Sequence, residues 1–475
     1  NQINQSKLHN MRGIRKLWFK IYILFMPIHH WMIGRSVGTY YDELNKSQWL
    51  PKKKIKELQN KKLNLLIQHA YKHVPYYRDI MDSLSLLPED IQSVEDLHKL
   101  PLLSKREVKD NIYFDLMSDN HDKSKIQKIT TSGSTGEPFT YFVDKHQLEF
   151  RWAATLRGME MTSYKFGDKQ ARLWHQTLGL SRIQILKEYL DAFFTRRKFF
   201  PVFEITKKNI DRMVKTITKY KPMLIDGYAE AINLCARYVS SKQNISNKKM
   251  SIISSAQMLP EHSRDLIEKN LNCKVYDKYG SREFSGIAYE CDAHLGHHVV
   301  AENYIVEILK DNQKAKHNEV GEIVITDLNN FCMPLIRYRI GDLAKSLGVK
   351  DCDCGRGLPL IGDIQGRVQS IIIGANGKYL PGTYFSHLFK DYEFIVQQYQ
   401  VIQTKVDEID LKIVKALRFE KNLFDELVNS ISAVLGKKTK INIYFVKNIP
   451  LIKTGKQTTV LSKIPIDFQN ISNKI

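Results

Sequence analysis

Short apolar segments alternate with longer amphipathic ones between residues 146 and 270. The short segments predict buried strands at 171–174, 223–228 and 251–255. The longer segments predict helices at 146–161, 209–220 and 260–270. Such alternation is typical of α/β domains, in which ligands gather at the carboxyl ends of the strands. The sequence therefore predicts a large N-terminal α/β domain with layered sheets.

Two further regions complete the predicted fold. Short strands between residues 299 and 326 predict a small β subdomain. After Gly366, a β-α-β-β-α-β order predicts a small C-terminal α+β domain of the ferredoxin-like kind. Because 475 residues exceed one ordinary domain, we expect an N-terminal domain of residues 1–366 and a mobile C-terminal domain of residues 367–475.

Residues 1–50 form a basic, partly apolar leader that is predicted to be helical. Its apolar stretch, 17–33, is interrupted by Lys20, Pro27 and two histidines, so it falls short of a membrane-spanning helix. Either this helix lies in a membrane interface or it packs on the protein's own core, and the second reading is favoured. We expect a cytoplasmic protein, with peripheral contact at the inner face of the membrane as the alternative that the leader leaves open.

The charge and the cysteines exclude several classes of protein. The formal net charge is +21, but the Lys and Arg residues are scattered, and no nucleic-acid-binding signature is present. We therefore expect a solvated basic surface and no nucleic-acid partner. Six cysteines in a chain of this length do not form a disulfide framework, which favours a reducing cytoplasm.

Hydroxyl side chains and glycines alternate in one segment of the N-terminal domain. Its residues are Thr131, Ser132, Gly133, Ser134, Thr135 and Gly136. The flanking segments, 128–130 and 139–143, have the composition of strands, so this segment is predicted to be a loop between strands. Glycine permits close backbone approach, and N–H groups and hydroxyls can then converge on phosphate oxygens. The loop is either such a phosphate cradle or a solvated polar connection.

Three other positions suggest chemistry only in combination. In Tyr279-Gly280-Ser281-Arg282-Glu283, a strand-like run breaks at Tyr-Gly, and the glutamate that follows can hold Mg²⁺ beside phosphates. Asp342, after Gly341, can accept hydrogen bonds from ribose hydroxyls. Lys456 lies in a glycine-containing loop that can carry charge into a site. Taken alone, the Tyr279–Glu283 motif is better explained as an ordinary surface turn, and Lys456 as a solvated lysine. The alternative for Asp342 is a turn residue favoured after glycine.

Three cysteines lie near histidine- and glycine-rich turns. Cys291 precedes a segment with His294, His297 and His298, and Cys352 and Cys354 form a C-x-C pair. Three thiolates and one imidazole make a tetrahedral zinc set, which would be structural because no coordination position stays open. The alternative is inert buried thiols, which is the reading for Cys235, Cys273 and Cys332.

The ordered motifs TSGSTGEP, YGSRE, RYRIGD, GR and TGK together resemble the adenylate-forming superfamily of acyl-, aryl- and aminoacyl-activating enzymes. Segments such as HAYKHVPYYR, YGSREFSGIAYEC and MPLIRYRIGDLA resemble its phenylacetate–CoA ligase branch, and within it the CapK-like proteins of capsule and O-antigen synthesis. The resemblance covers nearly the whole chain from Lys52 onward. It implies ATP and Mg²⁺ as cofactors.

The resemblance also implies roles for individual residues. Residues 131–136 match the loop that holds the β- and γ-phosphates of ATP, and Tyr279 and Gly280 match the wall of the adenine and acyl pocket. Ser281 and Arg282 follow in the same cofactor-binding segment. Glu283 matches the Mg²⁺ ligand, and Lys456 matches the mobile catalytic lysine. The remaining matches are Asp342 and Arg367 to the ribose ligands and His298 to the fourth zinc ligand.

Three residues depart from the pattern of the superfamily. Arg282 stands where much of it has threonine, although the CapK-like branch uses arginine. Gln369 and Ser370 occupy the places of an acidic hinge pair, which questions the usual domain rotation but not adenylation.

The predicted function is an AMP-forming ligase that activates a small-molecule carboxylate as its acyl-adenylate. The acyl group then passes to an amine, a hydroxyl or the thiol of CoA, in capsular polysaccharide or O-antigen synthesis. The alternatives are an aryl- or acyl-CoA ligase of the phenylacetate type, or a membrane-associated assembly protein that has the fold but no turnover.

Overall fold

The computed structural model describes residues 2–29, 33–131, 139–174, 182–200, 207–240, 250–255, 259–367, 372–376, 379–380, 384–385, 388–389, 391–392, 394–449 and 459–464. These residues form two compact units. Unit 1 comprises Asn1–Val306, Val324–Arg339 and Val349–Ile361, and unit 2 comprises Glu307–Ile323, Ile340–Gly348 and Gly362–Ile475. The predicted boundary between residues 366 and 367 stays a prediction.

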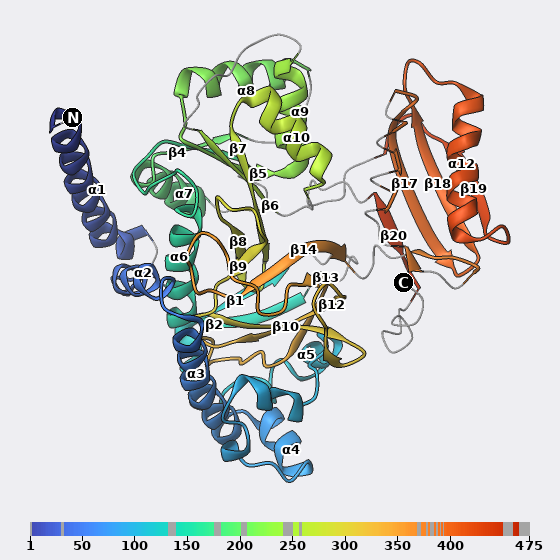
Figure 1. The fold of residues 1–475 in the computed structure, drawn as a ribbon. Helices are drawn as coiled ribbons and strands as arrows, with labels where there is room; N and C mark the ends of the chain where they lie inside the picture. The colour runs from blue at the N-terminus through green and yellow to red at the C-terminus, as the bar shows by residue number, and fades with distance from the viewer. Residues whose placement is uncertain are drawn as a thin grey trace. The chain divides into compact units, whose positions relative to one another are not determined.

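A parallel sheet forms the centre of unit 1 (Figure 1). Its parallel strands, in spatial order, are β4 (Arg197–Phe200), β3 (Gln170–Leu173), β5 (Leu224–Tyr228), β6 (Ser251–Ser255) and β7 (Lys274–Ser281). Antiparallel neighbours then follow: β8 (Ser285–Glu290), β9 (His297–Val299) and the first residues of β14 (Leu360–Arg367). The predicted α/β class is confirmed, and the three predicted buried strands are β3, β5 and β6.

Neighbouring residues of a strand point to opposite faces of a sheet. Since apolar residues of β6 point to both faces, helices cover both. On one face, Ile252 belongs to a core that includes residues of α8 (Lys207–Tyr220), α9 (Ala229–Ser240) and α10 (Glu261–Leu271). On the other face, Ile253 packs with Met159, the last residue of α6 (Lys145–Met159). The sheet is therefore the middle layer of a three-layer sandwich.

The N-terminal part of unit 1 is helical, as predicted. Its helices are α1 (Gln2–His29), α2 (Ser36–Ser47), α3 (Lys52–His73), α4 (Pro75–Ser83), α5 (Lys105–Asn111) and the 3-10 turns η1 (Pro88–Asp90), η2 (Val94–Lys99) and η3 (Lys123–Lys125). Ser104 caps α5 through its hydroxyl, which accepts from the Glu107 N–H at 3.2 Å. Strands β1 (Ile126–Thr131) and β2 (Phe139–Asp144) follow as an antiparallel pair. The sequence had not indicated α7 (Arg182–Phe194).

Helix α1 buries one of its faces, which supports the packed reading of the leader. Tyr22 and Met26 are fully buried. The Tyr22 hydroxyl donates to Asp191 of α7 at 3.1 Å and accepts from Trp152 Nε1 of α6 at 2.7 Å. In the part of the chain that the structure describes, no helix is long and apolar enough to cross a membrane.

Unit 2 contains the small C-terminal sheet. Its strands, in the order β19-β18-β17-β20, are Lys440–Phe445, Glu408–Lys415, Val396–Lys405 and Val460–Ser462. Helix α12 (Lys421–Leu435) contributes Phe424, Leu427, Ile431 and Leu435 to their shared core. A short pair, β15 (Ile372–Ile373) and β16 (Tyr379–Leu380), precedes them. The predicted small C-terminal α+β fold is confirmed.

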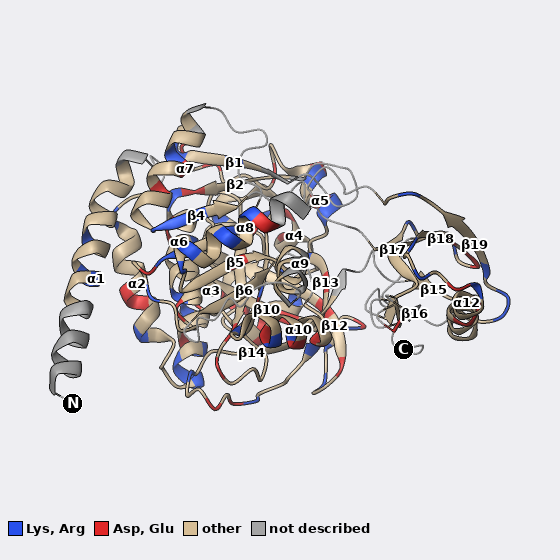
Figure 2. Cartoon of the chain, turned by 90° about the horizontal axis from the view of Figure 1, so that it is seen from above, with Lys and Arg blue, Asp and Glu red and all other residues tan. Residues whose placement is uncertain are grey.

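Four strands between residues 304 and 346 account for the predicted small β region. They are β10 (Tyr304–Lys310), β11 (Gln313–Lys314), β12 (Val320–Asp327) and β13 (Tyr338–Ser346). The chain passes from one unit to the other within β10, β12, β13 and β14. Lys and Arg residues are spread over many elements of the chain (Figure 2), as the sequence predicts.

A buried ion pair anchors the N-terminal helices to the core of unit 1. Arg157 of α6 donates to Glu302 at 2.8 Å, and the exposed fractions of the two side chains are 0% and 3%. The Ser47 hydroxyl at the end of α2 also donates to Glu302, at 2.5 Å. The Glu302 carboxylate therefore joins three segments that are far apart in the sequence.

We expect Arg157→Met to lower the free energy of unfolding by about 3–5 kcal/mol, because it leaves the Glu302 carboxylate buried without its partner. Urea unfolding followed by circular dichroism measures this change. The matched control is Lys54→Met, which breaks the exposed Lys54–Glu57 pair and should change stability little. Equal unfolding midpoints for Arg157→Met and the parent would contradict the anchoring role.

Candidate adenylation site and metal centre

The predicted phosphate loop connects two paired strands. Thr131 and Phe139 form the last residue pair of the β1–β2 ladder, so the loop leaves from the end of an antiparallel hairpin. Both flanking strands were predicted and are confirmed. Residues 132–138, including Ser132, Gly133, Ser134, Thr135 and Gly136, lie outside the described residues, and so does the side chain of Thr131.

The Tyr279–Glu283 motif forms the end of β7 and the turn that follows. Tyr279, Gly280 and Ser281 belong to the strand, so the prediction of a break at Tyr-Gly is wrong. Instead of a break, the structure has a register shift between Tyr279 and Gly280 in the pairing of β7 with β8. At Gly280 a Cβ atom would overlap the carbonyl oxygen of Ser285, so the close approach of the strands admits only glycine.

Two side chains from other elements fix this turn. The hydroxyl of Tyr141, on β2, donates to the Arg282 carbonyl oxygen at 2.5 Å. Arg151, on α6, donates to the same oxygen at 3.0 Å and to the Ser285 hydroxyl at 3.1 Å. Burial raises the pKa of Tyr141, so its hydroxyl stays a donor at neutral pH. The strand that follows the predicted phosphate loop is thus bonded to the turn that carries Glu283.

Sequence reasoning missed both Tyr141 and Arg151. Tyr141 is one of several aromatic residues in a β-like run, and Arg151 lies in a helix that buries polar as well as apolar residues. Their partner is more than 130 positions away in the sequence. No local pattern signals such a pair.

The remaining predicted nucleotide ligands lie in unit 2. Asp342 is in the middle of β13, after Gly341 with a φ of +83°, and only 7% of it is exposed. Arg367 is the last residue of β14, and its side chain is outside the described residues. Lys456 also lies outside them. The roles predicted for these residues stay predictions.

Cys291, His298, Cys352 and Cys354 come together at the far end of the β7–β8 hairpin. Cys291 follows β8, His298 is the middle residue of β9, and the two other cysteines precede β14. Their candidate ligand atoms all lie within 4.8 Å of one another. The Cys291 and Cys352 sulfurs are 3.6 Å apart, and the Cys354 sulfur lies 3.2 Å from His298 Nε2.

This four-residue cluster fits a tetrahedral zinc ion. With Zn–S bonds of about 2.3 Å, the edge between two sulfurs of a tetrahedron is about 3.8 Å, close to the separation of Cys291 and Cys352. Burial, and then the neighbouring charge of Arg356, lowers the pKa of His298 to about 4, so its imidazole is neutral at pH 7. Soft thiolates and a neutral imidazole are the donors that zinc prefers.

The C-x-C loop that supplies two of the sulfurs is held by the end of α2. The Gly357 N–H donates to the Gln48 carbonyl oxygen at 3.0 Å. Arg356 donates to the Gln48 side chain at 2.9 Å and lies over the Trp49 ring at 4.5 Å. The other cysteines are elsewhere: Cys235 and Cys332 are buried as expected, whereas Cys273 is half-buried.

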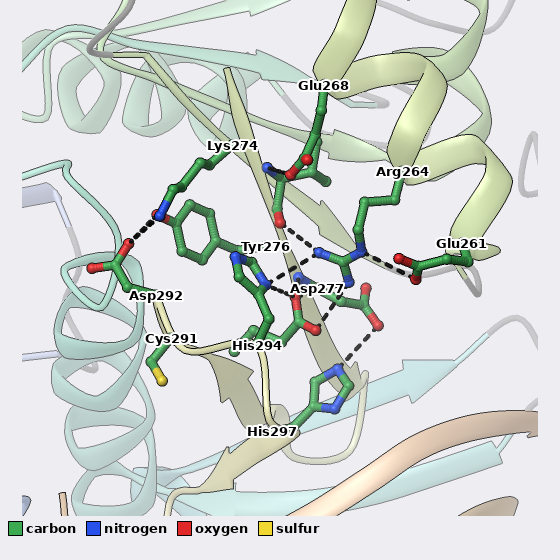
Figure 3. A network of polar contacts seen from close by, with 12 residues as sticks. Glu261, Arg264, Glu268, Lys274, Tyr276, Asp277, Cys291, Asp292, His294 and His297 are labelled. Carbon is green, nitrogen blue, oxygen red and sulfur yellow. Dashed lines mark hydrogen bonds and ion pairs between the residues drawn. The ribbon is translucent and has the colours of Figure 1, made fainter. Parts of the chain in front are cut away.

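A polar network lies beside the cluster and joins it to β7 (Figure 3). Arg264, on α10, donates to both carboxylate oxygens of Glu290 at 2.9 and 3.0 Å. Glu290 accepts from the Asp277 N–H at 2.6 Å, and the Asp277 carboxylate lies 3.1 Å from His297 Nε2. Glu290 directly precedes Cys291, and His297 directly precedes His298.

The charges in this network stabilise the ionised form of Glu290. Burial raises its pKa, but His294, His297 and Arg264 outweigh burial and lower the pKa to about 2. The carboxylate therefore stays charged at neutral pH and holds helix α10 and strand β7 together. Sequence reasoning weighed His297 only as a metal ligand and missed Arg264, Asp277 and Glu290.

Comparisons with known proteins show which proteins this chain resembles. Residues 372–463 match the family described as the CapK C-terminal domain. The chain is 24% identical over 434 residues to a phenylacetate-coenzyme A ligase of Thermus thermophilus, with 86% of this chain and 94% of that protein covered. It is 24% identical over 448 residues to Protein CapK of Staphylococcus aureus, with 91% and 94% covered.

A solved structure of 2-hydroxyisobutyryl-CoA ligase, in the postadenylation state with R3-HIB-AMP, has a similar fold. Its TM-score is 0.67 at 18% identity, and the match covers 88% of this chain and 92% of that chain. In fold and in sequence, the chain is thus similar to adenylate-forming carboxylate ligases. Within this class the chain is similar to the phenylacetate–CoA ligases and to CapK, which confirms the predicted resemblance and the predicted enzyme class.

The cysteine cluster makes a test possible that does not depend on activity. We expect about one zinc per chain in protein purified without chelator, measured by mass spectrometry of the metal, and less than a tenth of that in Cys354→Ser. The matched control is Cys273→Ser, a half-buried thiol outside the cluster, which should keep its zinc. Full zinc content in Cys354→Ser, or none in the parent, would show that the cluster is not a zinc site.

Proposed function

We propose that the protein activates a small-molecule carboxylate with ATP as the acyl-adenylate and then transfers the acyl group to an acceptor. One observation carries this proposal. The Tyr141–Arg282 hydrogen bond joins the hairpin that carries the hydroxyl- and glycine-rich loop to the turn that carries Glu283. Phosphate-binding N–H groups and a carboxylate for Mg²⁺ are the groups that phosphoryl chemistry needs close together.

Roles within unit 1 follow from that placement and from the sequence resemblance. Thr131, Ser132, Gly133, Ser134, Thr135 and Gly136 would hold the β- and γ-phosphates of ATP. Tyr279, Gly280, Ser281 and Arg282 would form the wall of the adenine and acyl pocket. Glu283 would hold Mg²⁺, and its half-buried position beside a fixed backbone turn suits a ligand that must not move.

Three further roles rest on the sequence resemblance alone. Asp342 and Arg367 would bind the ribose, and Lys456 would bridge the carboxylate and the α-phosphate. Bound ATP supplies the phosphorus that the carboxylate attacks, with pyrophosphate as the leaving group. Because the carboxylate and the phosphate are both anions, the Lys456 ammonium would offset their repulsion and stabilise the charge that develops between them.

The acceptor divides the proposal into two candidates. Similarity to Protein CapK supports transfer to an amine or hydroxyl in capsular polysaccharide or O-antigen synthesis. Similarity to phenylacetate-coenzyme A ligases supports transfer to the thiol of CoA. An exchange screen over sugar acids, amino acids, aryl acids and fatty acids, followed by product detection with and without CoA, distinguishes the two candidates.

We propose a structural role for zinc at Cys291, His298, Cys352 and Cys354. Four protein ligands leave no open coordination position. Moreover, Cys291 and the turn carrying Glu283 are at opposite ends of β8, which is ~20 Å long at about 3.3 Å per residue. A zinc ion there would hold β8, β9 and the loop before β14 together without contacting substrate.

The proposed reaction predicts carboxylate-dependent exchange of pyrophosphate into ATP. We expect Lys456→Ala to slow this exchange by about 10²-fold, because a charge placed at the reacting groups is lost. The matched control is Lys447→Ala, an exposed lysine of the same C-terminal region, which should exchange at the parental rate. If Lys456→Ala exchanges as fast as the parent, the role of this lysine is wrong. If none of the carboxylates supports exchange by the parent protein, the proposed function is wrong.

The hydrogen bond to Arg282 predicts a separation of stability from activity. Tyr141→Phe and Tyr77→Phe each remove one buried hydroxyl that donates to a backbone carbonyl, so each should cost about 1 kcal/mol of stability. Only Tyr141→Phe should lower kcat/KM for exchange, by roughly tenfold, since only Tyr141 contacts the turn before Glu283. Equal exchange rates in the two variants would remove the positioning role of Tyr141.

A further inference from the structure

Helix α1 carries apolar side chains on two faces, and only one of them is covered. Tyr22 and Met26 are fully buried against the rest of unit 1. Ile14, Leu17, Leu24 and Phe25 are instead 43–66% exposed. Four large apolar side chains spaced along one side of a helix are unusual on a surface where such residues normally occur singly.

Helix α7 also exposes apolar side chains. Its buried face carries the charged residue Asp191 together with Ala192. Its exposed face carries Ile183, Leu186, Tyr189, Leu190 and Phe193, which are 39–68% exposed. The spacing of three, four and three residues between Ile183, Leu186, Leu190 and Phe193 places them along one side of the helix. An amphipathic helix that packs only on its own domain turns its apolar side inward.

The two exposed sides adjoin through aromatic contacts. The Trp18 and Phe193 ring centroids are 6.3 Å apart, and the Phe25 and Phe194 rings stack at 5.7 Å. Trp18 Nε1 also donates to the Phe194 carbonyl oxygen at 2.6 Å. We name the outward residues Ile14, Leu17, Leu24, Phe25, Ile183, Leu186, Tyr189, Leu190 and Phe193 the α1–α7 face; its two helices can be followed in Figure 1.

The charge on α1 and on the segment after it has one sign, whereas α7 carries both, with Glu188 and the buried Asp191 beside Lys187. The first acidic residue of the chain is Asp42, so α1 and the segment after it contain no carboxylate side chain. The same stretch contains Lys7, Arg12, Arg15, Lys16, Lys20 and Arg35. Lys16 and Lys20 are exposed on α1 next to the apolar residues. Apolar and aromatic residues flanked by lysines are the composition of helices that lie in a lipid interface.

We propose that the α1–α7 face docks on an anionic lipid bilayer, with both helices lying in the headgroup region. The sequence indicated only the leader as a membrane contact, and α7 supplies the second half of the surface. Charge complementarity favours lipid over a second copy of the chain, because a second copy would bring another acid-free, cationic helix to the same contact. Each lysine near an anionic membrane surface strengthens binding about fivefold.

Co-sedimentation of the full chain with vesicles tests this docking. We expect binding to phosphatidylglycerol-containing vesicles, weaker binding in high salt, and little binding to pure phosphatidylcholine. The pair Ile183→Glu/Leu186→Glu should weaken binding to the anionic vesicles at least tenfold. The matched control, Leu84→Glu/Leu87→Glu, replaces two exposed leucines elsewhere in unit 1, which are 48% and 55% exposed, and should bind as the parent does.

A second pair keeps the test valid if the α7 variant is unstable. Lys16→Gln/Lys20→Gln changes only exposed side chains and should also weaken binding at least tenfold, while thermal unfolding stays unchanged. The proposal is overturned if the parent does not bind anionic vesicles, or if both double variants bind them as strongly as the parent does. It is also overturned if light scattering without vesicles shows a dimer of the parent that becomes a monomer in Ile183→Glu/Leu186→Glu. A second copy of the chain would then cover the α1–α7 face. None of these readouts requires ligase activity.

Discussion

The pairing of β7 with β8 is the constraint on which the rest of the site depends. The two strands approach so closely at Gly280 that no side chain fits there, and the ladder shifts register at that point. The shift presents the Arg282 carbonyl oxygen to Tyr141 and Arg151, which fixes the turn before Glu283. At its other end, the same hairpin places Cys291 among the other members of the cysteine cluster. One pair of strands thus positions both candidate centres.

Much of this arrangement is predictable from the sequence, for identifiable reasons. Strand β5 and helix α8 follow from local periodicity, and the C-terminal sheet follows from alternation along β17 and β18. Helix α7 has apolar residues at helical spacing, so its pattern was present in the sequence and was missed. Tyr141 and Arg264 act through partners in distant segments or neighbouring elements, and such pairs leave no repeating pattern in the chain.

The ion pair between Arg264 and Glu290 illustrates how a costly buried contact can be useful. Removing both charges from water is expensive, and the expense is offset only when the geometry is good and the other polar atoms are satisfied. Here the guanidinium contacts both carboxylate oxygens, and the carboxylate also accepts a backbone N–H from β7. These contacts therefore hold helix α10 and strands β7 and β8 in fixed positions relative to one another, beside the residues that form the cysteine cluster.

The cluster also has a consequence for biosynthesis. Cys291 and Cys352 are 61 positions apart, and the last cysteine comes two residues later. The four side chains can meet only after Cys354, the last of them in the chain, has been synthesised. Assembly of this corner therefore cannot precede synthesis of the C-x-C pair, and a polypeptide interrupted before Cys352 would expose Cys291 without its partners to cellular oxidants.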